Sequence, residues 1–114
     1  MANYIYRKLE EVPTIQCPCG ESTRIITCED TPVANIHVTY ITDSKKHYHK
    51  KVTEFYYILE GIGEMELGDE VVPLEPGVTI LIPPGLPHRA YGEVKCLIVG
   101  VPAWQHDDEF FCGE

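Results

Sequence analysis

The stretch HYHKKVTEFYYILEG, residues 47–61, combines a candidate ligand cluster with a strand pattern. His47 and His49 are two positions apart, so on an extended chain their side chains point to the same side. Glu54 follows five positions later and begins a run rich in Phe, Tyr and Ile that stops before Gly61. Residue types of this kind, ended by glycine, are typical of a β-strand. We therefore expect an extended segment at 47–49 and a strand over 54–60.

Similar short runs extend to both sides of this stretch, separated by Gly, Pro and Asp, and no helical periodicity of useful length is present. Regularly spaced short strands with turn residues between them favour an antiparallel sandwich or barrel. Two dipeptides, Gly68-Asp69 and Gly92-Glu93, are predicted to form tight turns. The further strands that we expect span residues 24–28, 33–41, 64–67, 70–74, 78–82, 87–91 and 94–101.

A fourth candidate ligand, His88, lies in the later stretch GVTILIPPGLPHRAYG, residues 77–92. Antiparallel strands bring distant parts of a chain together, so this histidine can join the cluster formed by His47, His49 and Glu54. Three imidazoles and one carboxylate suit Mn, Fe, Co, Ni, Cu or Zn, whereas Ca and Mg prefer oxygen ligands. The sequence thus predicts one divalent transition-metal ion per chain, of unspecified identity.

The spacing of these two stretches resembles the motifs of the cupin family. The first family motif is Gly, five residues, His-x-His, three or four residues, Glu, six residues and Gly, and His47, His49, Glu54 and Gly61 match it. The second is Gly, five residues, Pro-x-Gly, two residues, His, three residues and Asn, and residues 77–88 match it. Two turn positions depart from the pattern, with Ile41 in place of the first Gly and Gly92 in place of the Asn.

The resemblance implies an all-β fold, a single cupin jelly-roll β-barrel of antiparallel strands, and a homodimer packed through outer sheet faces. The length of 114 residues fits one domain over 1–114. Within it we expect an N-terminal strand segment at 1–30, a motif core at 41–92 and a C-terminal tail at 102–114. The aromatic side chains of the tail are expected to anchor it to the barrel wall.

Strand alternation predicts which side chains line the barrel. If Glu54 faces the lumen, so do Tyr56 and Ile58, and if His88 faces inward, so does Ala90. These three residues are the expected pocket positions, with Tyr56 as the polar group. Either Tyr40 or His37 could also face inward, but strict alternation does not allow both. Three further residues are expected to face away from the site: Tyr48, Arg89 and the tail residue His106.

Composition and charge limit the classes of binding partner and the cellular compartment that we expect. The formal net charge of −9 argues against nucleic acid and anionic membrane surfaces. The longest apolar runs are too short to span a bilayer, and the N-terminal residues lack a signal-peptide pattern, so we expect a cytoplasmic protein. Of its five cysteines, Cys17 and Cys19 form the one local cluster. We expect both to be free thiols, since a disulfide would close a very small loop.

Two functional hypotheses follow. The first is a small metalloenzyme, dioxygenase-like or isomerase-like, that acts on a small oxygen-rich molecule in the barrel. The second is a non-catalytic, metal-dependent sensor or binding module for a small molecule. The cupin scaffold serves many reactions, so the fold does not decide between them. The sequence identifies no catalytic residue beyond the candidate metal ligands. It also leaves open whether the protein is an enzyme. If it is one, we expect a metal-dependent oxidoreductase or isomerase.

Overall fold

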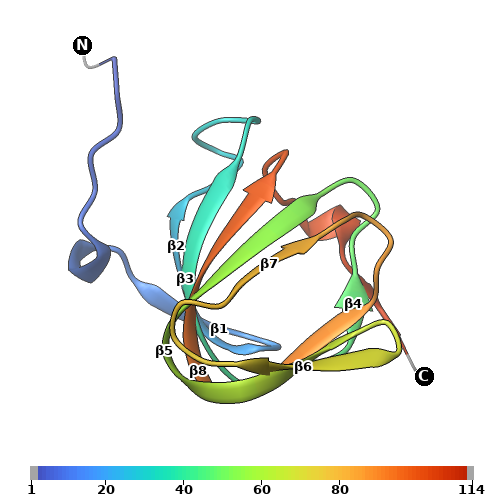
Figure 1. The fold of residues 1–114 in the computed structure, drawn as a ribbon. Coiled ribbons are helices and arrows are strands. Elements are labelled where there is room, and N and C mark those ends of the chain that lie inside the picture. Colours follow the sequence, from blue (N-terminus) through green and yellow to red (C-terminus); the bar gives the residue numbers. More distant parts are fainter. Residues whose placement is uncertain (1–2, 113–114) are drawn as a thin grey trace.

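A computed structural model describes residues 3–112 of the chain as a curled antiparallel sheet with no α-helix in that range. The sheet curls round into a barrel (Figure 1). The all-β prediction is therefore confirmed. The strands are β1 (Thr14–Cys17), β2 (Gly20–Ile26), β3 (Asn35–Asp43), β4 (His47–Tyr48), β5 (Thr53–Leu67), β6 (Glu70–Leu74), β7 (Thr79–Ile82), β8 (His88–Val101) and β9 (Phe110–Phe111), with short 3₁₀ turns at Leu9–Glu11 and His106–Asp108.

Strand β8 is the centre of the sheet. It pairs with β3 along one edge and with β5 along the other, while β1 and β2 extend the sheet beyond β3. At its start β8 also pairs with β4 through His47 and His88, and β9 lies beyond β4. Because the motif residues 47–49 lie beside the start of β8, residues about forty positions apart meet in one place.

Strands β5 and β8 are longer than expected, and they correct one prediction. Residues 54–60 and 64–67 lie in one strand, β5, and residues 88–91 and 94–101 lie in another, β8. Gly92-Glu93 is therefore not a tight turn. Gly63 faces Gly92 across the ladder, and a Cβ atom at either glycine would overlap backbone of the other strand. The glycines therefore let two paired strands bend together without breaking their hydrogen bonds.

The first hairpin, β1 and β2, holds two further differences. Residues 14–17 form a strand that sequence inspection missed, because the run is short and ends in the Cys17-Pro-Cys19 turn. The free-thiol expectation for this pair is wrong, since Cys17 and Cys19 are joined by a disulfide. The hairpin turn places their Cα atoms 5.3 Å apart, a separation that disulfides accommodate, whereas Cys28, Cys96 and Cys112 are free.

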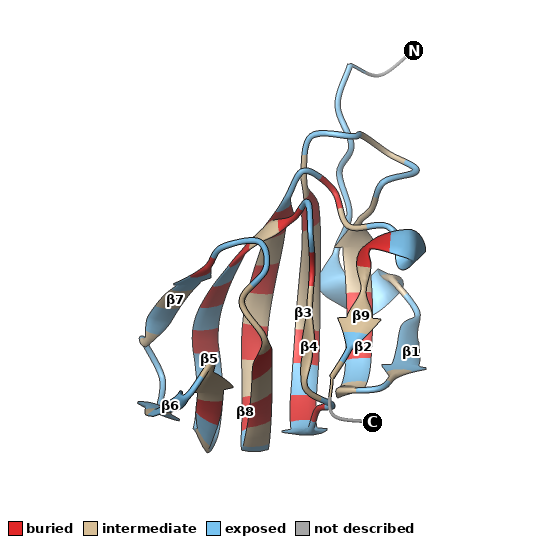
Figure 2. Cartoon of the chain, turned by 90° about the vertical axis from the view of Figure 1, so that its right-hand side faces the viewer, coloured by how far each residue is buried: buried red, intermediate tan, exposed pale blue. Residues whose placement is uncertain are grey.

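The interior of the barrel is partly filled and partly hollow. Strand β5 alternates as expected, with Glu54, Tyr56 and Ile58 buried and Phe55 and its outward neighbours exposed (Figure 2). Apolar side chains form a core cluster in one part of the barrel interior, and the polar cluster lies beside a cavity in another. The fully enclosed apolar side chains are Ile41, Ile58, Met65, Leu74, Ile82, Ala90, Val94 and Cys96.

Residues 102–112 of the tail pack back on the barrel, as expected. Residues 113–114 of the tail lie outside the described residues. Tyr48 stacks on Phe110 with ring centroids 5.4 Å apart, and Trp104 is half-buried against His37. No helix in residues 3–112 has the length and apolar character needed to cross a membrane.

Candidate metal centre

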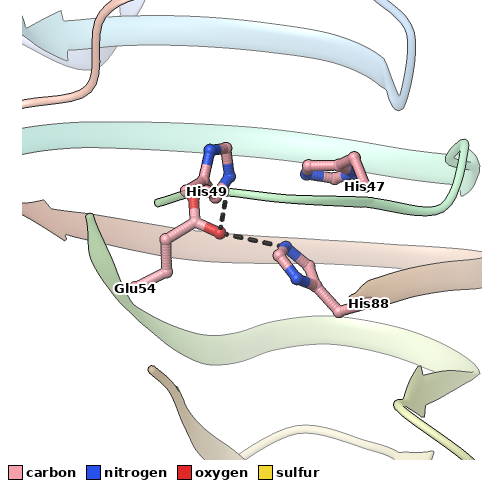
Figure 3. A group of neighbouring side chains, drawn as sticks. All are labelled: His47, His49, Glu54 and His88. Atoms are coloured by element: carbon pink, nitrogen blue, oxygen red, sulfur yellow. Dashed lines mark ion pairs between the residues drawn. The ribbon is translucent and has the colours of Figure 1, made fainter. Parts of the chain in front are cut away.

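The side chains of His47, His49, Glu54 and His88 converge on one point between the strands (Figure 3). One ligand atom from each lies within 4.8 Å of the others. His47 comes from β4 and His49 from the loop that follows it, while Glu54 is near the start of β5 and His88 begins β8. The structure thus brings together the four residues that the motifs had singled out.

Each imidazole is held by a backbone carbonyl through its Nδ1 atom. His47 Nδ1 lies 2.8 Å from the Lys45 oxygen, and His88 Nδ1 lies 3.0 Å from the Leu86 oxygen. His49 Nδ1 lies 2.7 Å from the oxygen of Asp108. A carbonyl only accepts, so in the neutral rings Nδ1 carries the proton and Nε2 presents a lone pair to the cluster. This arrangement is the usual support of metal-binding histidines.

The chemistry of the donor set fits a bound cation. Glu54 Oε1 lies 3.3 Å from His49 Nε2 and 3.1 Å from His88 Nε2. Both Glu54 Oε1 and His88 Nε2 are buried, and neither has a hydrogen-bond partner. Two acceptors that face each other at this distance need a proton or a metal ion between them. A metal bound by all four residues would satisfy the lone pairs that the fold leaves facing one another.

The pKa values of the cluster show how strongly it attracts positive charge. Burial lowers the pKa of His47 to about 4, and the nearby His88 adds to the effect. Burial also opposes the charged form of His49, but the negative charge of the nearby Glu54 carboxylate outweighs it and raises that pKa to about 8. Glu54 is itself buried, yet its contacts with His49 and His88 hold its pKa well below the usual range. Without a metal, a proton on His49 takes the place of the cation.

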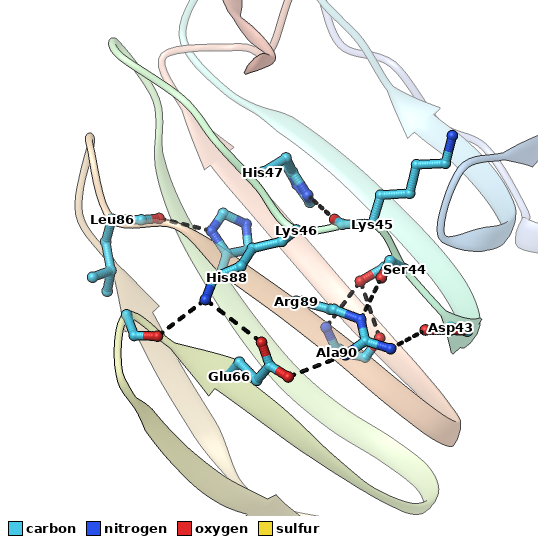
Figure 4. A network of polar contacts seen from close by, with 11 residues as sticks. Asp43, Ser44, Lys45, Lys46, His47, Glu66, Leu86, His88, Arg89 and Ala90 are labelled. Atoms are coloured by element: carbon cyan, nitrogen blue, oxygen red, sulfur yellow. Dashed lines mark hydrogen bonds and ion pairs between the residues drawn. The ribbon is translucent and has the colours of Figure 1, made fainter. Parts of the chain in front are cut away.

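The segments that carry His47 and His88 are fixed from outside by Arg89 (Figure 4). Its guanidinium donates to the Ser44 carbonyl at 3.0 Å, to Asp43 at 2.7 Å and to Glu66 at 3.1 Å. Ser44 in turn exchanges hydrogen bonds with both backbone groups of Ala90. Arg89 faces away from the barrel interior, as predicted, and it positions the strand starts.

Asp108 supports the centre from the tail, a role that sequence inspection missed. Its buried carboxylate accepts hydrogen bonds from the backbone N–H groups of Lys50 and Lys51, and its carbonyl holds His49. An acidic residue in an acidic tail carries no local signal of this contact. The tail therefore helps to orient a candidate ligand almost sixty positions away.

A cavity of about 480 Å³ is lined by His47, His49 and Glu54 but not by His88, and its size is typical of small-molecule sites. Tyr56 lines it, whereas Ile58 and Ala90 lie in the apolar core below and do not line it. Of the two open alternatives on β3, His37 lines the cavity and Tyr40 is exposed. His106 is exposed but borders the cavity next to Trp104, at a ring separation of 4.8 Å.

Comparisons with known proteins identify the family. The model of the Cupin domain family matches residues 36–99, more than half of the chain. A crystal structure of a protein from Planctomyces limnophilus superposes with a TM-score of 0.90 at 30% identity, covering 96% of this chain and 98% of that one. The chain belongs to the cupin family.

Two further likenesses complete this picture. Uncharacterized protein MJ1618 of Methanocaldococcus jannaschii is 42% identical over 66 residues, which are 54% of this chain and 53% of that protein; this chain thus matches about half the length of that relative. Streptomyces PAC13 with uridine has a TM-score of 0.86 at 20% identity, over 98% of this chain and 92% of that one. PAC13 is described as a nucleoside dehydratase, and at this identity it shows a shared fold only.

Proposed function

We propose that this cupin binds one divalent transition-metal ion through His47, His49, Glu54 and His88 and is a small metalloenzyme. The single observation that carries the proposal is the buried contact between Glu54 Oε1 and His88 Nε2, two acceptors without a proton donor. A metal in this donor set supplies a Lewis acid, and four protein ligands leave room for further ligands on Mn, Fe or Ni.

The residues around the centre support binding of a small oxygen-rich molecule. Tyr56 points from β5 into the cavity two positions from Glu54, and burial raises its pKa well above the usual value. It therefore remains a neutral hydroxyl that can donate a hydrogen bond to a ligand oxygen. The apolar core below the cavity excludes water from that side. These features fit oxidation or isomerisation of a chelating hydroxy or keto acid.

A non-catalytic, metal-dependent binding module is the second candidate. The same cavity would serve it, and within residues 3–112 the carboxylates that border the cavity are those of the candidate ligand Glu54 and of Glu109. The existence of a nucleoside dehydratase on the same fold supports catalysis on a barrel of this size. It says nothing about the substrate of this chain.

The test is to load the protein separately with Fe(II), Mn(II), Co(II), Ni(II) and Zn(II) and to incubate it with a panel of small hydroxy and keto acids. Dioxygen uptake and proton NMR report oxidation and isomerisation. Turnover that is lost in Glu54→Gln would support the metalloenzyme. Perturbation of the Co(II) spectrum by an acid, with no turnover for any metal, would select the binding module. No metal binding at all would refute both.

A further inference from the structure

Arg24 occupies an inward-facing position on the same curved surface as the candidate metal centre. In the strand register Arg24 pairs with His37, His37 with Ile98, and Ile98 with Tyr56. All four residues line the cavity that also contains His47, His49 and Glu54. The row spans three strand spacings, about 14 Å measured along the sheet. The sheet is curled (Figure 1), and the residues at both ends of the row line the same cavity.

The guanidinium of Arg24 has no acidic partner among residues 3–112. The other two arginines of the chain are both paired, Arg7 with Asp30 and Arg89 with Asp43 and Glu66. Arg24 makes no hydrogen bond or ion pair in that range, and its Nε is buried without an acceptor. Glu54 and Glu109 border the same cavity, but neither forms an ion pair with Arg24, which stands out in a chain with 18 acidic and 9 basic residues.

The Arg24 guanidinium lies over the ring of Trp104. The Arg24 Cζ atom is 4.9 Å from the centre of the Trp104 ring, a cation–π contact. The indole Nε1 of Trp104 is also buried without an acceptor. Stacking leaves the N–H edge of a guanidinium free for a planar, bidentate acceptor such as a carboxylate. Arg24 and Trp104 thus place N–H donors in one region of the cavity, and no acceptor within residues 3–112 receives a hydrogen bond from them.

Leaving aside the candidate ligand histidines, the formal charges of the side chains that border the cavity balance in the absence of a metal. Two basic residues, Arg24 and Lys45, stand against two acidic ones, Glu54 and Glu109. Burial and the charge of Arg24 lower the pKa of His37 to about 4, so this histidine is neutral near pH 7. A divalent ion on the Glu54 side would give the cavity an excess of two positive charges, in a protein whose net charge is otherwise negative. That excess favours an anionic ligand.

We propose that Arg24 and Trp104 form a carboxylate subsite, so that the ligand of this cupin is a short acid with two functional ends. One end chelates the metal, and the other end carries a carboxylate that receives the Arg24 guanidinium. This inference rests on the proposed function, because the first end requires the metal. His37 lies between the two ends and contacts the chain that links them.

The proposal is tested with two 2-oxo acids of equal length on the Co(II) protein, at constant ionic strength. Both 2-oxoglutarate and 2-oxopentanoate chelate through the keto acid, but only the former carries a distal carboxylate. The visible Co(II) spectrum gives each dissociation constant. Wild type should bind 2-oxoglutarate at least about tenfold more tightly, the effect of a charge-assisted hydrogen bond. Arg24→Gln should abolish that preference and leave the affinity for 2-oxopentanoate unchanged.

Two control variants separate this effect from a loss of folding. Arg24→Lys keeps the charge and should retain part of the preference, while Arg7→Gln removes an arginine that pairs with Asp30 outside the cavity and should retain all of it. Circular dichroism checks that each variant is folded. A preference that survives in Arg24→Gln, or that is absent from the wild type, would overturn the subsite.

A second arm keeps the subsite testable if the metal proposal fails. Trp104 is the single tryptophan of the chain, so its fluorescence reports directly on the contact with Arg24. Glutarate should change this fluorescence saturably in metal-free wild type and not in Arg24→Gln. If neither 2-oxo acid perturbs the Co(II) spectrum but glutarate gives this result, the metal chemistry is wrong and the carboxylate subsite stands. If glutarate has no effect on Trp104, the subsite is refuted.

Discussion

Metal affinity should depend on pH up to about pH 8, because a proton on His49 competes with the ion. The pKa of His47 is about 4, so that ring is already neutral at pH 6, whereas the pKa of His49 is about 8. A pKa raised in this way means that the proton stays on His49 at any pH below about 8. The metal must displace it, which weakens the apparent affinity about tenfold for each pH unit below that value. From pH 8 to pH 6 the loss is on the order of a hundredfold.

The assay is competition for Co(II) or Zn(II) against a chelator of known pH dependence, at half-unit steps from pH 6 to pH 9. The matched variant is Glu54→Gln, which removes the charge that raises the pKa of His49 and leaves the burial that lowers it. Its affinity should be weaker throughout, and the steep region should move to lower pH. A wild-type affinity that changes by less than about threefold between pH 6 and pH 8 would refute the reasoning.

Three further outcomes follow from the structure. Tyr56→Phe should weaken the binding of small chelating acids to the Co(II) protein without changing its metal content, and equal affinities would exclude a role for the hydroxyl. Gly61→Ala should lower the free energy of unfolding in urea by more than Gly77→Ala, because both glycines have positive φ but only at Gly61 would a Cβ meet the Glu93 carbonyl. We expect a loss of about 1 kcal/mol for Gly77→Ala and of at least about 2 kcal/mol for Gly61→Ala. Similar losses for the two variants would contradict this explanation. Light scattering should give a dimer of twice 12.9 kDa, because the outer faces of β5 and β7 expose Phe55, Tyr57 and Leu81; a monomer at micromolar concentration would disprove it.

The four candidate ligands could be predicted because their geometry depends on local rules. The spacing of His47 and His49 fixes a shared side through strand alternation, and the same rule placed Glu54 with Tyr56. The glycines at turns and the Pro83-Pro84-Gly85 loop then fixed the frame around His88. Such features are readable from one sequence because each involves residues only a few positions apart.

The supporting residues could not be predicted, because they meet the site only through long-range contacts. Asp108 reaches His49 across nearly sixty positions, and Arg24 faces the cavity only because β2 pairs with β3. Gly92 was misread because a glycine that allows two long strands to bend has the same local signal as a turn. The pairing of Cys17 with Cys19 depends on a hairpin whose first strand carries almost no sequence signal.

The most direct test of the account is the metal content of the purified, untagged protein and of two ligand variants, measured by elemental analysis together with protein concentration. We predict about one divalent transition-metal ion per chain in the wild type. His49→Ala should lose most of it, and a variant with both His47→Ala and His88→Ala should lose essentially all of it while keeping the β-sheet circular dichroism signal. Full occupancy in the double variant, or a metal-free wild type that cannot be loaded, would contradict the central claim.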